Sequence, residues 1–402
     1  MISNFATPYY LFDEQEVITR AGKIRDEIYA WSGRICYAIK ANPFLIPALL
    51  PIVDKFEVCS PGELEICRRY RVPGEKILFS GVVKTEEDIQ KALDYPVDTI
   101  TLESMSHWTY LKEAISSSDA AGSGRGRMIK ILPRLTSGAQ FGMSFESILR
   151  IVQEQQAMDP VFFEGIHFFS GTQKKGAKYE KELTSLREKL SMLCEMLPNQ
   201  DLILEYGPGL SVPYFVGDDF DSSLDAIASL KDYILSQNYP FRIDVELGRY
   251  IAASCGTYHT SVVDLKTAED RYYCLVDGGI NQVNYYGQNM AMRTPLITQV
   301  RSGRSALSSS KVGTCIEGKH DYMICGSLCT FADILVRGLE LEDVRIGDEL
   351  IFHNIGAYSV TESAYLFLSH PLPGIYLKHA DGDIERLRDN LETFPLNSFD
   401  PS

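Results

Sequence analysis

The chain has 402 residues, of which 45% are hydrophobic and 23% are charged, a composition typical of a globular rather than a disordered protein. Its net charge of −15 disfavours a nucleic-acid partner, because binding a phosphate backbone needs a basic surface. No apolar run approaches the roughly 18 residues of a membrane span, and the first residues lack the pattern of a secretion signal. We therefore expect a cytoplasmic protein with no membrane partner and enough chain for two domains.

The cysteines argue against a metal or redox site. There are nine of them, an odd number, and they are scattered without a C-x-x-C pair. Such a pair is the usual sequence sign of these sites. The pattern predicts reduced thiols, mostly in the core, and no metal.

Apolar runs rich in β-forming residues alternate with helix-like segments from about residue 34 to 253. This alternation predicts an α/β fold, a (β/α)8 barrel, with its functional site on the loops at the C-terminal ends of the strands. Periodicity alone is also compatible with an irregular doubly wound sheet. A flexible surface loop is expected at 117–128. The eight runs are 34–39, 56–60, 76–81, 99–104, 128–135, 162–171, 201–209 and 241–248.

From about residue 254 onward the pattern changes. The apolar runs become short, alternate with polar residues and are bounded by turn residues. This pattern is typical of an antiparallel β domain.

The stretch YAIKANP (37–43) ends a run of β-forming residues with Lys40, one residue before an Asn-Pro pair that ends strands and starts turns. On its own, a solvated charge at a strand end explains it equally well. A lysine amine can also form a Schiff base with the aldehyde of pyridoxal phosphate (PLP). PLP further needs a phosphate cradle, a group on its pyridine nitrogen and an aromatic face.

Other motifs offer these groups. In YGPGLSVPY (206–214), Gly207 and Gly209 lack side chains, so backbone N–H groups can approach a phosphate. DVELGRY (244–250) carries Glu246, which could keep the pyridine nitrogen protonated. A turn or a surface ion pair would explain each motif alone.

A third motif, EGIHFFSGTQ (164–173), supplies His167, Phe169 and Thr172 at a strand end. A core aromatic strand with one hydrogen-bonded histidine is the simpler interpretation of this motif alone. The combination of all these motifs favours a PLP site.

Taken in order, these and further motifs resemble the PLP-dependent fold-type III decarboxylases, the group of diaminopimelate, ornithine and arginine decarboxylases. The resemblance covers nearly the whole chain. It implies an alanine-racemase-like (β/α)8 barrel over residues 26–253. It also implies an antiparallel β-sandwich or β-barrel domain of residues 1–25 and 254–402, which includes the N-terminal strand. The motifs are YAIKAN (37–42), EVCSPGEL (57–64), GIHFFSGTQ (165–173), EYGPGLSVPY (205–214), VELGRYIAASCG (245–256), GSLCTFAD (326–333) and NIGAYSV (354–360).

The resemblance also assigns roles, residue by residue. Lys40 matches the lysine that holds PLP, and Glu246 matches the partner of the pyridine nitrogen. Cys329 matches the cysteine that returns a proton after CO₂ leaves. In the family this cysteine comes from the partner subunit, so a homodimer with shared active sites is implied. Asp333 and Thr330 fall at substrate-facing positions, and the remaining cofactor contacts match Phe169, Thr172, Gly207, Gly209, Gly248, Arg249 and Tyr358.

The chain departs from the family pattern at three informative positions. Phe169 replaces a histidine that stacks on the PLP ring, which keeps an aromatic face but loses any ring charge. Pro208 replaces a glycine of the phosphate loop and removes one backbone donor. Thr330 stands where an acid meets a distal substrate ammonium. This change, with LSHPLP (368–373), resembles decarboxylases of siderophore and natural-product pathways, which act on amino acids extended by an acyl or carrier group.

The predicted function is therefore PLP-dependent decarboxylation of an amino acid, either free or linked to an acyl or carrier group. An alanine-racemase-like enzyme is one alternative, but Glu246 favours the strong electron sink that decarboxylation uses. The other alternative is a non-catalytic homologue that acts as a binding protein. The presence of Lys40, Glu246 and Cys329 argues against it.

Overall fold

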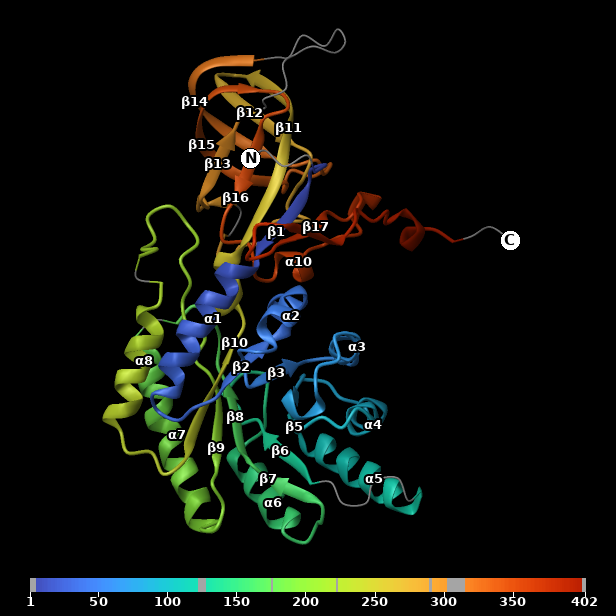
Figure 1. The fold of residues 1–402 in the computed structure, drawn as a ribbon, viewed down its shortest axis with the longest axis vertical. Helices are drawn as coiled ribbons and strands as arrows, with labels where there is room; N and C mark the ends of the chain where they lie inside the picture. Colours follow the sequence, from blue (N-terminus) through green and yellow to red (C-terminus); the bar gives the residue numbers. More distant parts are fainter. Residues whose placement is uncertain are drawn as a thin grey trace. The chain divides into compact units, whose positions relative to one another are not determined.

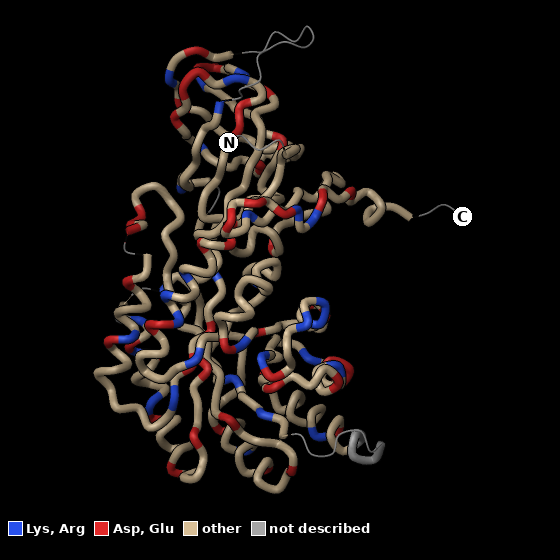
Figure 2. Tube along the Cα trace, viewed as in Figure 1, with Lys and Arg blue, Asp and Glu red and all other residues tan. Residues whose placement is uncertain are grey.

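The structure is a computed structural model that describes residues 5–121, 128–174, 176–221, 223–288, 291–301 and 315–399. The chain divides into two compact units (Figure 1). The barrel unit consists of Ile18–Val212 and Asp221–Ile251. The β unit consists of the described residues of Met1–Val17, Pro213–Phe220 and Ala252–Ser402. Acidic residues occur throughout both units, interspersed with basic ones (Figure 2).

The barrel unit is built on one parallel sheet with the strand order β7-β6-β5-β4-β3-β2-β10-β9-β8. A bridge between Arg134, directly after β6, and His167 of β8 brings the two ends of this order together. The predicted barrel is thereby confirmed. Its strands are β2 (Ile35–Ala38), β3 (Lys55–Val58), β4 (Ile77–Phe79), β5 (Thr99–Leu102), β6 (Ile129–Pro133), β7 (Val161–Phe163), β8 (Gly165–Phe169), β9 (Ile203–Gly207) and β10 (Arg242–Leu247).

The strands are buried on both faces, which explains their mostly apolar sequences. Cys36, Leu78, Leu132 and Ile203 form one apolar cluster with a side chain from each of β2, β4, β6 and β9. Alternate strands supply such layers in (β/α)8 barrels. The barrel therefore has a packed core, and its chemistry is left to the strand ends.

Helices follow most of the barrel strands. The Ser60 hydroxyl accepts the Glu63 N–H ahead of α3, and a capping box of Thr85 and Asp88 begins α4. Among the described residues, no helix has the length and apolar character needed to cross a bilayer. The helices are α1 (Glu14–Tyr29), α2 (Ile46–Leu49), α3 (Pro61–Arg69), α4 (Glu86–Asp94), α5 (Met105–Ala121), α6 (Phe145–Gln155), α7 (Ala177–Met196), α8 (Asp225–Ser236), α9 (Arg249–Ala252) and α10 (Ser359–Glu362).

The loop expected at 117–128 begins later than predicted, because α5 continues to Ala121. Ser and Ala tolerate a helical backbone, and the helix extends through them. Residues 122–127 lie outside the described part of the chain.

The β unit contains one mostly antiparallel sheet. The N-terminal strand β1 pairs antiparallel with β11 and parallel with β17, so it belongs to this unit as predicted. Tyr10, Phe12 and Tyr258 are fully buried in its core. The strands are β1 (Tyr9–Asp13), β11 (Gly256–Ala268), β12 (Arg271–Val276), β13 (Ile297–Val300), β14 (Cys315–Cys325), β15 (Ile334–Arg345), β16 (Glu349–Phe352), β17 (Gly374–Lys378) and β18 (Ile384–Arg388).

Candidate active site

Lys40 lies at the C-terminal end of β2, on a single 3-10 turn formed by Ile39–Ala41. The Asn42 side chain accepts the Phe44 N–H at 3.1 Å, which starts the next turn and ends the strand direction. The Lys40 amine forms an ion pair with Glu57 of β3. Its Nζ also lies 3.7 Å from Oε1 of Glu246 on β10. One amine is thus held between two carboxylates from the neighbouring strands.

Both carboxylates are buried, whereas Lys40 is partly open to solvent. The side chains of Glu57 and Glu246 are 3% and 7% exposed, and that of Lys40 is 38% exposed. The Cys59 thiol donates to Glu57 Oε1 at 3.0 Å and lies 3.4 Å from Lys40 Nζ. Burial raises the pKa of this thiol well above its usual range, with Glu57 adding to the rise. Cys59 therefore stays a protonated thiol that donates a hydrogen bond in this cluster.

Glu246 is kept ionised by its surroundings. Burial by itself raises the pKa of this carboxyl group, but Lys40, the hydrogen bond from His167 and the charge of Arg134 together lower it. His167 Nε2 lies 3.1 Å from Glu246 Oε2. An ionised carboxylate only accepts hydrogen bonds, so Nε2 carries the hydrogen and donates it. His167 thereby fixes the orientation of Glu246.

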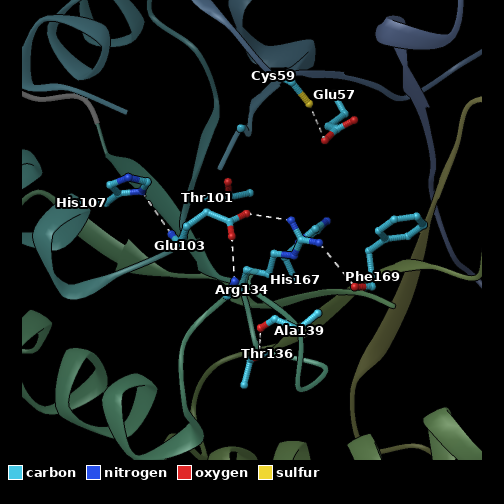
Figure 3. Close-up of polar contacts among 12 residues, drawn as sticks. Glu57, Cys59, Thr101, Glu103, His107, Arg134, Thr136, Ala139, His167 and Phe169 are labelled. Atoms are coloured by element: carbon cyan, nitrogen blue, oxygen red, sulfur yellow. Dashed lines mark hydrogen bonds and ion pairs between the residues drawn. The ribbon is translucent and has the colours of Figure 1, made fainter. Parts of the chain in front are cut away.

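A second buried ion pair lies beside His167. Arg134 Nη1 is 2.9 Å from Glu103 Oε1, and Arg134 Nη2 donates to the Phe169 carbonyl oxygen at 3.4 Å. Figure 3 shows Glu103, Arg134 and Phe169 linked in a row, with His167 next to Arg134. The positive charge of Arg134 thus faces the end of β8.

Lys84 is a second amine near the strand ends. Its Nζ donates to the Gly81 carbonyl oxygen at 2.6 Å and to Thr101 Oγ1 at 3.3 Å. Burial lowers the pKa of Lys84 to about 8, although Glu103 opposes the shift. At neutral pH, a larger fraction of Lys84 is therefore unprotonated than of a lysine with the ordinary pKa.

The predicted phosphate loop follows β9. A Cβ added to Gly207 would lie 2.6 Å from Cδ2 of Phe169, so the absent side chain leaves room for that ring. Gly209 has a φ of 58°, in the left-handed region that favours glycine. Thr172, half-buried, lies on the segment after β8.

Two further predicted contacts follow β10. A Cβ on Gly248 would lie 3.0 Å from the Cβ of Ala41, beside the turn that carries Lys40. Arg249 begins α9 and is buried. Strands β10, β9 and β8 are neighbours, so the predicted phosphate contacts of this unit follow adjacent strands.

The remaining predicted residues belong to the β unit. Cys329 and Thr330 are exposed on the loop between β14 and β15. Asp333 is buried, and its carboxylate accepts the N–H of Ile280 at 2.8 Å and the N–H of Leu328 at 2.7 Å. Tyr358 has a φ of 69° and precedes α10. Asp333 therefore shapes the loop that presents Cys329.

The sequence predictions did not include Glu57, Cys59, Lys84, Glu103 or Arg134 as site residues. Three of them carried the signal that singled out Lys40 and Glu246, namely a charge at or near the end of an apolar strand run. They are Glu57, Glu103 and Arg134.

Comparison with known proteins decides the family. The model of the pyridoxal binding domain of pyridoxal-dependent decarboxylases matches residues 14–253. The chain belongs to this family. It is thus a PLP-dependent decarboxylase, and the PLP cofactor predicted from the sequence is confirmed.

Several relatives resemble this decarboxylase along most of their length. A 2-[(L-alanin-3-ylcarbamoyl)methyl]-2-hydroxybutanedioate decarboxylase of Staphylococcus aureus is 27% identical over 375 residues, which cover 86% of this chain and 88% of the relative. An L-glutamyl-[BtrI acyl-carrier protein] decarboxylase of Niallia circulans is 25% identical, with 96% and 92% covered. The structure of the M. jannaschii diaminopimelate decarboxylase with L-lysine has the same fold, with a TM-score of 0.81, 20% identity and 99% and 93% covered.

The residues of this decarboxylase fit PLP in three respects. Lys40 offers a partly accessible amine for the aldehyde. Glu246 offers a buried, ionised carboxylate within 3.7 Å of that amine. Gly207 and Gly209 occupy positions where a Cβ would crowd Phe169 and Lys174. Such a loop leaves its backbone open to an anion.

Proposed function

We propose that this enzyme removes the α-carboxyl group of an amino acid with Lys40 as the lysine that binds PLP and Glu246 as the partner of the pyridine nitrogen. The observation that carries this proposal is the Lys40 amine held between the buried carboxylates of Glu57 and Glu246. When bound, PLP supplies the sink for the electrons that CO₂ leaves behind. Glu246 keeps a proton on the pyridine nitrogen, and His167 holds Glu246 in place.

The other residues bind and move protons. Glu57 forms an ion pair with the Lys40 ammonium group whenever Lys40 is not bonded to PLP. The backbone of Gly207 and Gly209, with Thr172, Gly248 and Arg249, would bind the phosphate, and Phe169 would cover the ring. Cys329 returns a proton to the α-carbon.

The substrate we propose is an amino acid extended by an acyl or carrier group, with a neutral or acidic far end. Thr330 supports this choice, because threonine cannot neutralise a distal ammonium as an acid does. Two of the relatives support it as well, since their names specify an acylated amino acid and a carrier-linked glutamate.

Assays of CO₂ release test the substrate. We expect a higher kcat/KM for a carboxylate-bearing N-acyl 2,3-diaminopropionate or a carrier-linked L-glutamate than for diaminopimelate, L-ornithine or L-lysine. The expected difference is at least about tenfold, which corresponds to the binding energy of one contact. Preference for a diamino acid would reject the extended substrate and keep the decarboxylase. Racemisation without CO₂ release, followed by chiral analysis, would favour the alanine-racemase-like alternative instead.

We also propose a cytoplasmic homodimer in which Cys329 of one subunit, on the loop that the buried Asp333 shapes, completes the site of the other. Mixing inactive Lys40→Ala protein with inactive Cys329→Ala protein should then restore activity, because only a heterodimer has a site with both native residues. Statistical exchange makes half the dimers heterodimers with one good site of two, so about a quarter of wild-type activity is expected. No recovery, with exchange demonstrated by an affinity tag, would place both residues in one subunit.

A further inference from the structure

A partly buried polar cluster lies next to the predicted cofactor loop. We call it the Lys174 cluster, and it consists of Ser170, Lys174, Glu182 and Tyr206. Lys174 Nζ lies 2.8 and 3.1 Å from the two carboxylate oxygens of Glu182 and 3.0 Å from Ser170 Oγ. The Tyr206 hydroxyl donates to Glu182 at 2.6 Å, and the Ser170 hydroxyl also donates to Glu182. The Glu182 carboxylate on α7 therefore accepts hydrogen bonds from three side chains, which lie on β9 and on the segment that follows β8.

The Lys174 cluster is attached to the glycine loop, which we define as Gly207–Leu210. The Lys174 N–H donates to the Gly209 carbonyl oxygen at 2.8 Å. A Cβ on Gly209 would lie 2.9 Å from Cε of Lys174, so the lysine stem packs directly against this glycine. Next to it, Gln173 exchanges two hydrogen bonds with the backbone of Val212. A shift of Lys174 would therefore move the loop.

The cluster also contacts Phe169, which stands where the resembling family has a histidine. The Phe169 ring centroid lies 6.0 Å from Lys174 Nζ and 6.0 Å from Cζ of Arg134. The negative face of an aromatic ring attracts a cation at this range. Two cations thus restrict the ring that Gly207 accommodates.

Burying a lysine only to fill space is unfavourable, because its charge loses hydration. Lys174 is 5% exposed, and burial lowers its pKa although Glu182 opposes the shift. A buried ion pair is often no more stabilising than apolar side chains of similar volume. The charged pair therefore calls for a role other than holding α7 against the strands.

We propose that Lys174, held by Glu182, is a positioning residue that fixes the glycine loop and the Phe169 ring so that the loop binds the phosphate of PLP. The inference rests on the proposed function, in which this loop is the phosphate site.

The test compares PLP with pyridoxal, which lacks the phosphate. Full-length protein is stripped of PLP and reloaded with each compound, and Kd is measured by quenching of intrinsic fluorescence. We expect Lys174→Met to weaken PLP binding about tenfold, the loss of one well-placed interaction, and to leave the Kd of pyridoxal nearly unchanged. Lys181→Met, an exposed lysine on α7, is the matched control and should behave as wild type. Lys174→Arg should recover most of the affinity.

Thermal unfolding of each variant separates positioning from simple packing. A lower Tm with an unchanged ratio of the two Kd values would overturn the inference, as would an equal loss of affinity for PLP and pyridoxal. If Lys174→Met does not fold, Glu182→Gln gives the same reading, because it leaves Lys174 without its counter-ion. Wild-type protein that binds both compounds equally would instead overturn the phosphate role of the loop, and the inference with it.

Discussion

Replacement of Lys40 by alanine is expected to abolish both the covalent attachment of PLP and decarboxylation, while the barrel still folds. The side chain is 38% exposed and projects from a strand end, so the core does not depend on it. Its loss leaves Glu57 and Glu246 without their cation, so a modest drop in Tm is expected as well. The visible absorbance of lysine-bound PLP, CO₂ release and circular dichroism measure the three effects.

Lys84 is the matched control for this experiment. Its pKa of about 8 gives it a larger free-amine fraction than a lysine of ordinary pKa has, so it is a rival attachment site. We expect Lys84→Met to retain the absorbance of bound PLP. Peptide mapping after borohydride reduction should find the label on Lys40. A label on Lys84 would overturn the assignment.

Replacement of Glu246 by glutamine is expected to retain lysine-bound PLP and to slow CO₂ release by about 10²–10³, the usual effect of removing one electrostatic partner of a developing charge. A neutral amide cannot hold a proton on the pyridine nitrogen, so the electrons left by CO₂ are poorly stabilised. The measurement is kcat at saturating substrate, with cofactor content determined on the same sample.

Glu205→Gln controls for the general effect of changing a buried acid in the barrel. Glu205 lies on β9, next to β10, and is fully buried. Burial raises the pKa of Glu205 well above its usual range, although Lys55 opposes the shift, and Glu205 is not one of the proposed site residues. We expect kcat close to wild type. Equal slowing in both variants would remove Glu246 from its role.

The barrel could be predicted because its strands are apolar on both faces and are separated by amphipathic helices. One strand boundary could not. The run 162–171 is predicted as one strand, yet its first part pairs with β6 as β7 and its second part pairs with β9 as β8. Gly165, with a φ of 153°, lies where a Cβ would collide with the Ile203 carbonyl group. A close approach of this kind depends on a strand far away in the sequence.

The candidate site was predictable in part for the same physical reason. Lys40 and Glu246 end strand runs, and the carboxyl ends of parallel strands meet at one edge of the sheet. The partnership of Glu182 with Lys174 carries no such signal. Glu182 sits within α7, among several other charged residues, and only the packing of that helix selects it for the buried side.

Pro208 affects the glycine loop in a second way, beyond the loss of one donor. It is buried between Gly207 and Gly209, the two residues of the loop with the greatest backbone freedom in an unfolded chain. The proline ring fixes φ near −65° and so reduces the number of conformations available to the loop. Less conformational entropy is then lost when the loop becomes ordered around an anion. The proposed phosphate cradle is in this sense preorganised, which would offset the affinity lost with one N–H group.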